Sequence, residues 1–259
     1  MSTTVEARLG PIEQVHRVRR GLRRGQLIGA VSLSSIGVLA WSVAAYRAYI
    51  AYTEYGPLLI GRWVTLPLVL GLIVAGAGLW LGLRAWRTWH MRVRRHANGL
   101  AILRGRRGRA MAWPDVRALW SRAERTGLPG LSGSRRLRLE VEANDGRRIR
   151  LDDSLEDFEG LALAIKGRVY PLLLELYTRA FNEHQPIAFG PIRLGPAGIE
   201  DGPRSPYAWK EVRGVQLAAG RLMIQTTRPG GQPAITVAAH RVPNVELCAQ
   251  LIQEIGQTG

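Results

Sequence analysis

Two long uncharged runs of apolar residues stand out from an otherwise mixed pattern. They cover residues 27–46 and 63–83, and neither contains Asp, Glu, Lys or Arg. A helix rises about 1.5 Å per residue, so about 20 residues cross a hydrocarbon core of about 30 Å. Both runs have that length, and a long helix of a soluble protein normally keeps a polar face. The pattern therefore predicts two membrane-spanning helices joined by a short connection.

After the second run the pattern changes to short stretches in which apolar and polar residues alternate. Residues 136–143 and 147–152 alternate in this way, and Asn144-Asp145-Gly146 lies between them. Residues 220–227 and 234–239 form a second such pair around a Pro-Gly-Gly turn. Alternation on both sides of a glycine turn is typical of a β-hairpin. The soluble part is thus predicted to contain at least these two hairpins.

A helical pattern follows each predicted hairpin. The first helix is predicted over 154–169 with Ser154 as its N-cap, and the last over 243–255. A further helical segment, 170–185, separates the two halves. Residues 121–136, rich in Gly and Ser, are expected to form a mobile loop.

The same short motif occurs once in each half of the soluble part. Residues 112–119 read AWPDVRAL and residues 208–215 read AWKEVRGV. A buried tryptophan would supply apolar area to each half, and the acid two positions later could accept hydrogen bonds from turn amides. We therefore interpret the motif as a folding signature and not as an active site. Its residues are Trp113, Asp115 and Val116, and Trp209, Glu211 and Val212.

The charge distribution predicts the orientation in the membrane. Lys and Arg number 36 against 20 Asp and Glu, a net charge of +16. Arginines concentrate outside the two runs, at Arg8, Arg17, Arg19, Arg20, Arg23 and Arg24 before them, and at Arg84, Arg87, Arg92, Arg94 and Arg95 after them. The connection holds only Arg47 and Arg62. The positive-inside rule therefore places both termini in the cytoplasm, which makes this a multi-pass protein of the cytoplasmic (inner) membrane.

One basic stretch is a candidate binding site. It lies at 104–113, shortly after the second run, and its arginines are Arg104, Arg106, Arg107 and Arg109. Each arginine near an anionic leaflet contributes about 1 kcal/mol to binding, so these residues are candidate contacts for anionic lipid. A solvated turn that only helps to set the topology explains the same residues. Nucleic acid is disfavoured as a partner, because no aromatic side chains are interleaved with the basic ones.

The sequence contains no recognisable catalytic or metal-binding pattern. The histidines are scattered without metal-ligand spacing, and neither a Gly-x-Ser-x-Gly nor a phosphate-loop motif is present. The acids within 152–159 suit the N-terminus of the predicted helix. The single cysteine, Cys248, lies in an apolar run and is expected in the core. We therefore expect no enzymatic activity, no metal and no cofactor.

The chain resembles an uncharacterised bacterial family of predicted membrane proteins. The resemblance rests on Asn98-Gly99-Leu100, Trp113-Pro114-Asp115-Val116, Asp145-Gly146-Arg147-Arg148, Phe189-Gly190-Pro191, Gly198-Ile199, Trp209-Lys210-Glu211-Val212 and Val242-Pro243-Asn244. It implies two N-terminal transmembrane helices followed by tandem domains like the pleckstrin-homology (PH) domain. It implies no particular activity.

Together these observations predict a membrane-anchored α+β protein. A basic cytoplasmic segment (1–24) precedes a two-helix transmembrane hairpin (25–83). Two PH-like β-barrel or sandwich units follow at 90–185 and 186–259, each with a C-terminal helix. We expect a non-enzymatic interaction module that docks anionic lipid, a protein partner or both. A structural subunit that assembles with copies of itself and an enzyme of unrecognised type are the alternatives.

Overall fold

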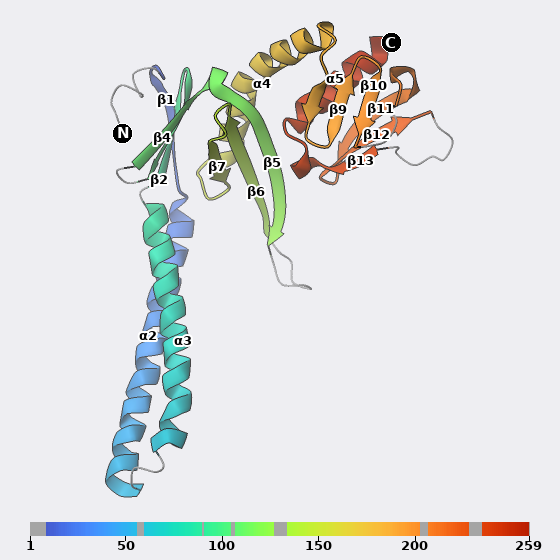
Figure 1. Cartoon of the computed structure of the whole chain (residues 1–259). Helices are drawn as coiled ribbons and strands as arrows, with labels where there is room; N and C mark the ends of the chain where they lie inside the picture. Colours follow the sequence, from blue (N-terminus) through green and yellow to red (C-terminus); the bar gives the residue numbers. More distant parts are fainter. Residues whose placement is uncertain are drawn as a thin grey trace. The chain divides into compact units, whose positions relative to one another are not determined.

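A computed structural model describes residues 9–55, 60–89, 91–104, 107–126, 134–202, 207–227 and 235–258. The fold is α+β, with two long apolar helices and several small antiparallel sheets (Figure 1). The chain divides into two compact units. One unit contains residues 17–93 and 102–109, and the other contains residues 2–16, 94–101 and 110–259.

The two apolar runs form the helices α2 (Arg20–Ile50) and α3 (Ile60–Trp89), which pack along one another in the first unit (Figure 1). Both helices extend beyond the predicted runs. By length and composition, each is able to cross a membrane. Small residues allow the close packing, since a Cβ atom added at Gly37 would lie 2.9 Å from the Cβ of Ala75. At Gly78 the added atom would lie 2.7 Å from Oγ of Ser34.

The first sheet has the order β1-β2-β3-β4. Its strands are β1 (Ile12–Arg17), β2 (Met91–His96), β3 (Gly99–Arg104) and β4 (Arg107–Ala112). Strand β1 comes from the segment that the sequence indicated only as a basic N-terminal stretch. The helices α2 and α3 are therefore inserted between the first and second strands of one sheet.

The second sheet contains the first predicted hairpin. Strands β5 (Val116–Thr126), β6 (Ser134–Ala143) and β7 (Arg148–Asp152) pair in the order β5-β6-β7. The expectation of a mobile loop over 121–136 was wrong at both ends, because residues 121–126 and 134–136 lengthen β5 and β6. Residues 127–133 lie outside the described residues.

A single helix, α4 (Phe158–Asn182), follows and joins the two predicted helical segments without interruption. Ser154 is not its N-cap. The backbone N–H and the hydroxyl of Ser154 both donate to the carboxylate of Asp152, which forms a local turn instead. The helix begins at Phe158, four residues after Ser154, and follows Asp157, which is in the left-handed conformation (φ 51°).

The C-terminal half contains two three-stranded sheets and one helix. Strands β8 (Ile187–Phe189), β9 (Ile192–Gly195) and β10 (Gly198–Asp201) form one sheet in the order β10-β9-β8. Strands β11 (Val212–Ala218), β12 (Arg221–Thr226) and β13 (Ile235–Ala238) form the other. Helix α5 (Val245–Thr258) packs its apolar face into their common core. This core contains Cys248, whose burial raises the pKa of the thiol.

Candidate functional site

The arginine-rich stretch lies at the end of the first sheet where the helices join it. Strand β2 starts at Met91, directly after α3 ends at Trp89. Strands β2 and β3 are joined by a two-residue turn, so they are antiparallel and β3 returns toward the start of β2. The last residue of β3, Arg104, and the first residue of β4, Arg107, therefore lie at the end of the sheet where α3 joins it.

Strand β1 brings the start of α2 to the same end of the sheet. The N–H groups of Ala97 and Asn98 donate to the carbonyls of Pro11 and Leu9, so β1 begins at the far end, beside the β2–β3 turn. It then runs toward the helices and ends at Arg17, three residues before α2 begins. The start of α2, the end of α3 and the end of β3 thus lie at the same end of the first sheet.

The structure describes the four candidate lipid contacts to different extents. Arg109 lies in β4 with an exposed side chain. Arg104 and Arg107 are placed in β3 and β4, but their side chains are outside the described part, as is all of Arg106. The interpretation of these residues as a turn was wrong for three of them, because Arg104 is the last residue of β3 and Arg107 and Arg109 belong to β4.

Aromatic side chains are exposed near both ends of the helical hairpin. Tyr46, Tyr49 and Tyr52 are exposed near the end of α2. Trp80, Trp86 and Trp89 are exposed toward the end of α3, at the base. Rings of this kind, with an apolar body and a polar tip, are typical of a membrane–water interface.

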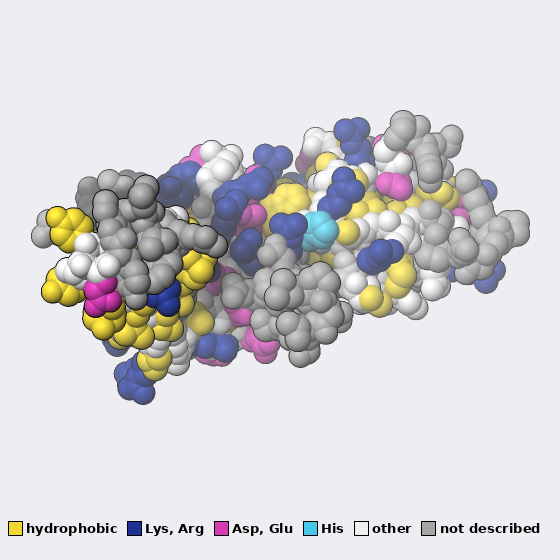
Figure 2. Space-filling view, turned by 90° about the horizontal axis from the view of Figure 1, so that it is seen from below, with side chains coloured by type: hydrophobic (Ala, Val, Ile, Leu, Met, Phe, Trp, Pro, Cys, Tyr) yellow, Lys and Arg dark blue, Asp and Glu magenta, His cyan; other side chains and the backbone are white. Residues whose placement is uncertain are grey.

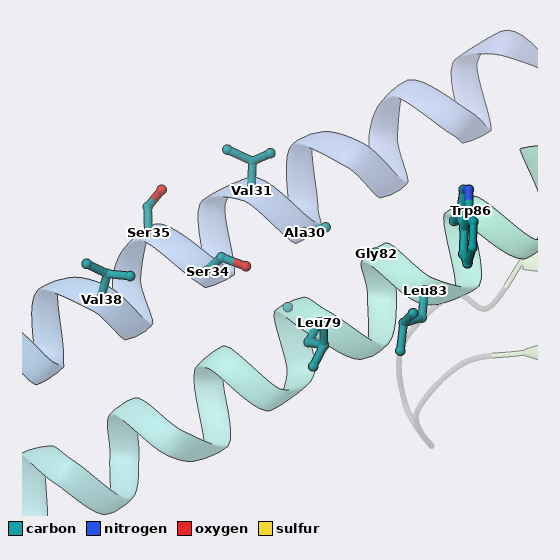
Figure 3. A pocket seen from close by; sticks show the side chains of 10 residues that line it. Ala30, Val31, Ser34, Ser35, Val38, Leu79, Gly82, Leu83 and Trp86 are labelled. Atoms are coloured by element: carbon teal, nitrogen blue, oxygen red, sulfur yellow. The ribbon is translucent and has the colours of Figure 1, made fainter.

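A groove of about 650 Å³ runs between α2 and α3 (Figure 3). In Figure 3, Ala30 and Ser34 point toward α3, whereas Val31 and Ser35 point away from it. On α3 the groove is lined by Gly78, Gly82 and Trp86, among others. Its lining is mainly apolar and combines small residues with larger ones such as Leu79 and Leu83.

The two tryptophan motifs have matching local geometry. The indole N–H of Trp113 donates to the carbonyl of Ala97 at 3.0 Å, and that of Trp209 donates to the carbonyl of Gly195 at 2.9 Å. Trp113 is 5% exposed and Trp209 is half-buried. In both places the tryptophan opens a short 3-10 turn and therefore fixes the entry into the next sheet.

The acid of each motif accepts a hydrogen bond through its backbone carbonyl. The carbonyl of Asp115 accepts from the N–H of Asn144, and that of Glu211 accepts from the N–H of Thr227, both at 2.8 Å. Val116 and Val212 then begin the strands β5 and β11. These contacts join each motif to a later part of the chain, and the expectation that the acid side chains accept from turn amides stays a prediction.

The acidic stretch at the start of α4 holds no metal-ligand cluster. Among the described residues, no group of three or more His, Cys, Asp or Glu side chains is arranged to hold an ion. Asp152 instead binds Ser154, and the carboxylate of Asp157 lies against Gly160 in the first turn of α4.

A model of the family DUF6585, a family of unknown function, matches residues 23–258. The chain belongs to this family. No curated protein and no solved structure matches it. The DUF6585 match contains α3, nearly all of α2 and every strand except β1, which ends before the match starts.

Sequence reasoning missed one buried polar residue of this DUF6585 chain. Asn244 is 0% exposed, and its Oδ1 accepts from the N–H of Leu119 in β5 at 2.7 Å. Its own N–H donates to the carbonyl of Leu119 at 2.8 Å, and its Nδ2 donates to the hydroxyl of Tyr177 at 2.9 Å. Asparagine just before a helix is a capping signal, so the sequence could have indicated a role for Asn244 at the start of α5. It could not have indicated the contact with Leu119.

Proposed function

We propose that the protein is a non-enzymatic interaction module anchored in the cytoplasmic membrane by α2 and α3, with both termini in the cytoplasm. It docks anionic lipid through the arginines at the base of the helical hairpin, and a protein partner binds through the soluble part. Lipid headgroups are the ligands, and no cofactor takes part.

One observation carries the proposal: the strand order brings Arg104, Arg107 and Arg109 to the edge where both apolar helices enter the sheet. If α2 and α3 cross the bilayer, this edge lies at the level of the lipid headgroups. Arg19, Arg20 and Arg23 at the start of α2 add positive charge at the same end. Anionic lipid would then neutralise these arginine side chains, whose like charges otherwise repel one another.

We also propose that the soluble part is a tandem pair of PH-like units. The matched indole hydrogen bonds and the matched carbonyl contacts of Asp115 and Glu211 support a common ancestor fold. In each half a three-stranded sheet precedes a helix, as β5–β7 precede α4 and β11–β13 precede α5. In this proposal the first PH-like unit includes strand β1, which precedes the two helices in the sequence. The helical hairpin of α2 and α3 is then an insertion into that PH-like unit.

The test uses the full chain reconstituted in vesicles of mixed neutral and anionic phospholipid. A variant with Arg104, Arg106, Arg107 and Arg109 changed to Gln should bind anionic lipid about a thousandfold more weakly, because four arginines at about 1 kcal/mol each contribute about 4 kcal/mol. A control with Arg168, Arg179, Arg193 and Arg221 changed to Gln loses the same charge elsewhere and should behave like wild type. Equal lipid binding by all three proteins would contradict lipid docking, and release of the chain by a carbonate wash would contradict the anchor.

A structural subunit is the second candidate, and the groove of Figure 3 favours it. Its lining combines small residues such as Ser35 with apolar ones such as Val38 and Leu79, a surface on which another transmembrane helix packs. A second copy of α2 and α3 would then occupy the groove and join the chains within the membrane.

A further inference from the structure

A cavity of about 930 Å³ lies within the unit that contains residues 110–259. The β5–β6 hairpin and the first turns of α4 form one side, and the β11–β12 turn and the start of α5 form the other. Its volume falls in the range of about 300–1,000 Å³ that is typical of small-ligand sites. Figure 2 shows hydrophobic side chains at the surface beside basic, acidic and histidine side chains near the middle of the view, and the cavity lining has the same mixed composition. The proposed function above assigns no role to this cavity.

The exposed part of the apolar lining is aliphatic. Leu163 of α4 is 69% exposed and Leu217 of β11 is 45% exposed. Leu139, Phe158 and Val245 also line the cavity, but they are buried. Covering an exposed leucine removes apolar surface from water, which is favourable in proportion to the area covered. An aliphatic group of a ligand therefore suits these two leucines.

The turn between β11 and β12 keeps its side of the cavity small and apolar. It consists of Ala219 and Gly220, whose φ angles are 50° and 72°. Turns in which both central residues have positive φ usually carry asparagine or aspartate first, because alanine is disfavoured in this conformation. A methyl group thus occupies a place where a larger polar side chain would suit the backbone better. Backbone strain of this kind is found at binding sites, where the surrounding structure maintains it.

The charges of the cavity are balanced within the protein. The charged lining residues that the structure describes are Arg122, Arg138, Lys166, Glu159 and Glu246. Both arginines interact with other groups of the chain, and Arg138 lies opposite Asp152 in the β6–β7 ladder. With Asp152, three acids match three bases. An ionic ligand would lose its hydration on entering a lining whose described charges already balance, so an uncharged ligand is favoured.

Lys166 supplies a hydrogen-bond donor to the cavity. Its Nζ carries three N–H groups, and one of them donates to Oε1 of Glu246 at 2.5 Å. The other oxygen of this carboxylate accepts from the hydroxyl of Tyr170 at 3.0 Å, so Glu246 is held on both sides and in turn positions Lys166. The Lys166 side chain is 19% exposed and lines the cavity, so a further N–H can donate to a ligand oxygen. Because the charge of Lys166 is already paired, an uncharged oxygen acceptor suits this donor.

We propose that the cavity binds a neutral amphiphile with a single aliphatic chain. The chain covers Leu163 and Leu217, and a hydroxyl or ester oxygen of its uncharged head accepts a hydrogen bond from Lys166. An amphiphile with an ionised head, such as a fatty carboxylate, would bring a charge that the balanced lining does not match.

The experiment uses the full chain in vesicles of neutral phospholipid, with photoactivatable single-chain probes at equal molar fractions. Three probes share one aliphatic chain and end in an alcohol, a carboxylate or a methyl group, and an alkaline buffer keeps the carboxylate ionised. Mass spectrometry of the cross-linked peptides should find the alcohol on 137–139, 158–166 or 217–220. The carboxylate should label these positions about tenfold less and the methyl-ended probe about fivefold less. Equal or stronger labelling by the carboxylate would overturn the neutral ligand, and equal labelling by the methyl-ended probe would overturn the hydrogen bond from Lys166.

A matched pair of leucines on α4 provides the control. Leu163→Gln should lower cavity labelling by the alcohol about fivefold, because the amide would lose hydration beside an aliphatic chain. Leu176→Gln changes a leucine that is 59% exposed on the same helix but outside the cavity, and it should leave labelling unchanged. Equal labelling of both variants overturns the proposal. Label on α2 and α3 in the same sample reports the membrane anchor separately, so the two proposals fail independently.

Discussion

At the scale of the residue, Asn244 links distant parts of the soluble unit. It has φ 50°, a conformation that asparagine adopts more readily than alanine, and it binds Leu119 and Tyr177. Burial raises the pKa of the Tyr177 hydroxyl, so this partner stays protonated.

Substitutions of Asn244 separate the contribution of its side-chain hydrogen bonds from that of its backbone conformation. Asn244→Ala should lower the free energy of unfolding by about 2–4 kcal/mol, because it leaves the buried N–H of Leu119 unpaired and strains the backbone. Asn244→Gly relieves the strain and should recover about 1 kcal/mol. Urea unfolding of the full chain in detergent, followed by tryptophan fluorescence, measures both. The exposed Asn182→Ala is the control, and a loss no larger than in this control would contradict the role of Asn244.

At the scale of the element, β1 shows how a polar segment becomes part of a sheet. It reads IEQVHR, and its isoleucine and valine remain exposed. Buried His16 anchors it, with Nδ1 3.1 Å from the carbonyl of Glu156, and Glu13 pairs with Arg95 at 3.1 Å and with Arg168 at 3.1 Å. Such contacts come from three separate parts of the chain, which is why the segment looked like an independent basic tail.

Deletion of residues 1–17 tests this element. It keeps α2 and α3 intact but exposes the edge of β2. Hydrogen exchange of β2 amides should accelerate about tenfold or more, because their protection depends on the neighbouring strand. Exchange in β12, in the distant sheet, serves as the internal reference. Unchanged exchange in β2 would show that the strand contributes nothing to the sheet.

At the scale of the whole molecule, the groove of Figure 3 predicts how chains would assemble. Ser35 lines the groove, whereas the exposed Ile36 does not. If copies meet there, Ser35→Cys should form disulfide-linked dimers upon oxidation in membranes, and Ile36→Cys should form far fewer. Native Cys248 is buried and should not react. If Ser35→Cys gave only monomer, copies of the chain would not meet at the groove, and lipid would fill it instead.

The sequence by itself determined the elements whose signal is local. Uncharged runs predicted α2 and α3, and alternation around Asp145-Gly146 predicted the hairpin of β6 and β7. These features depend on neighbours within a few residues, so periodicity and turn chemistry suffice. Ser154 failed as a cap because an equally local competitor, Asp152, captured its hydroxyl.

Only the tertiary structure decided which segments meet. Asn244 finds Leu119 across 125 positions, and β1 joins β2 across both apolar helices. The cavity likewise exists only where the β5–β6 hairpin and α4 approach the β11–β12 turn and α5. These long-range pairings form because they bury apolar side chains and satisfy buried hydrogen-bonding groups. A local pattern of apolar and polar residues does not predict which distant segments pair.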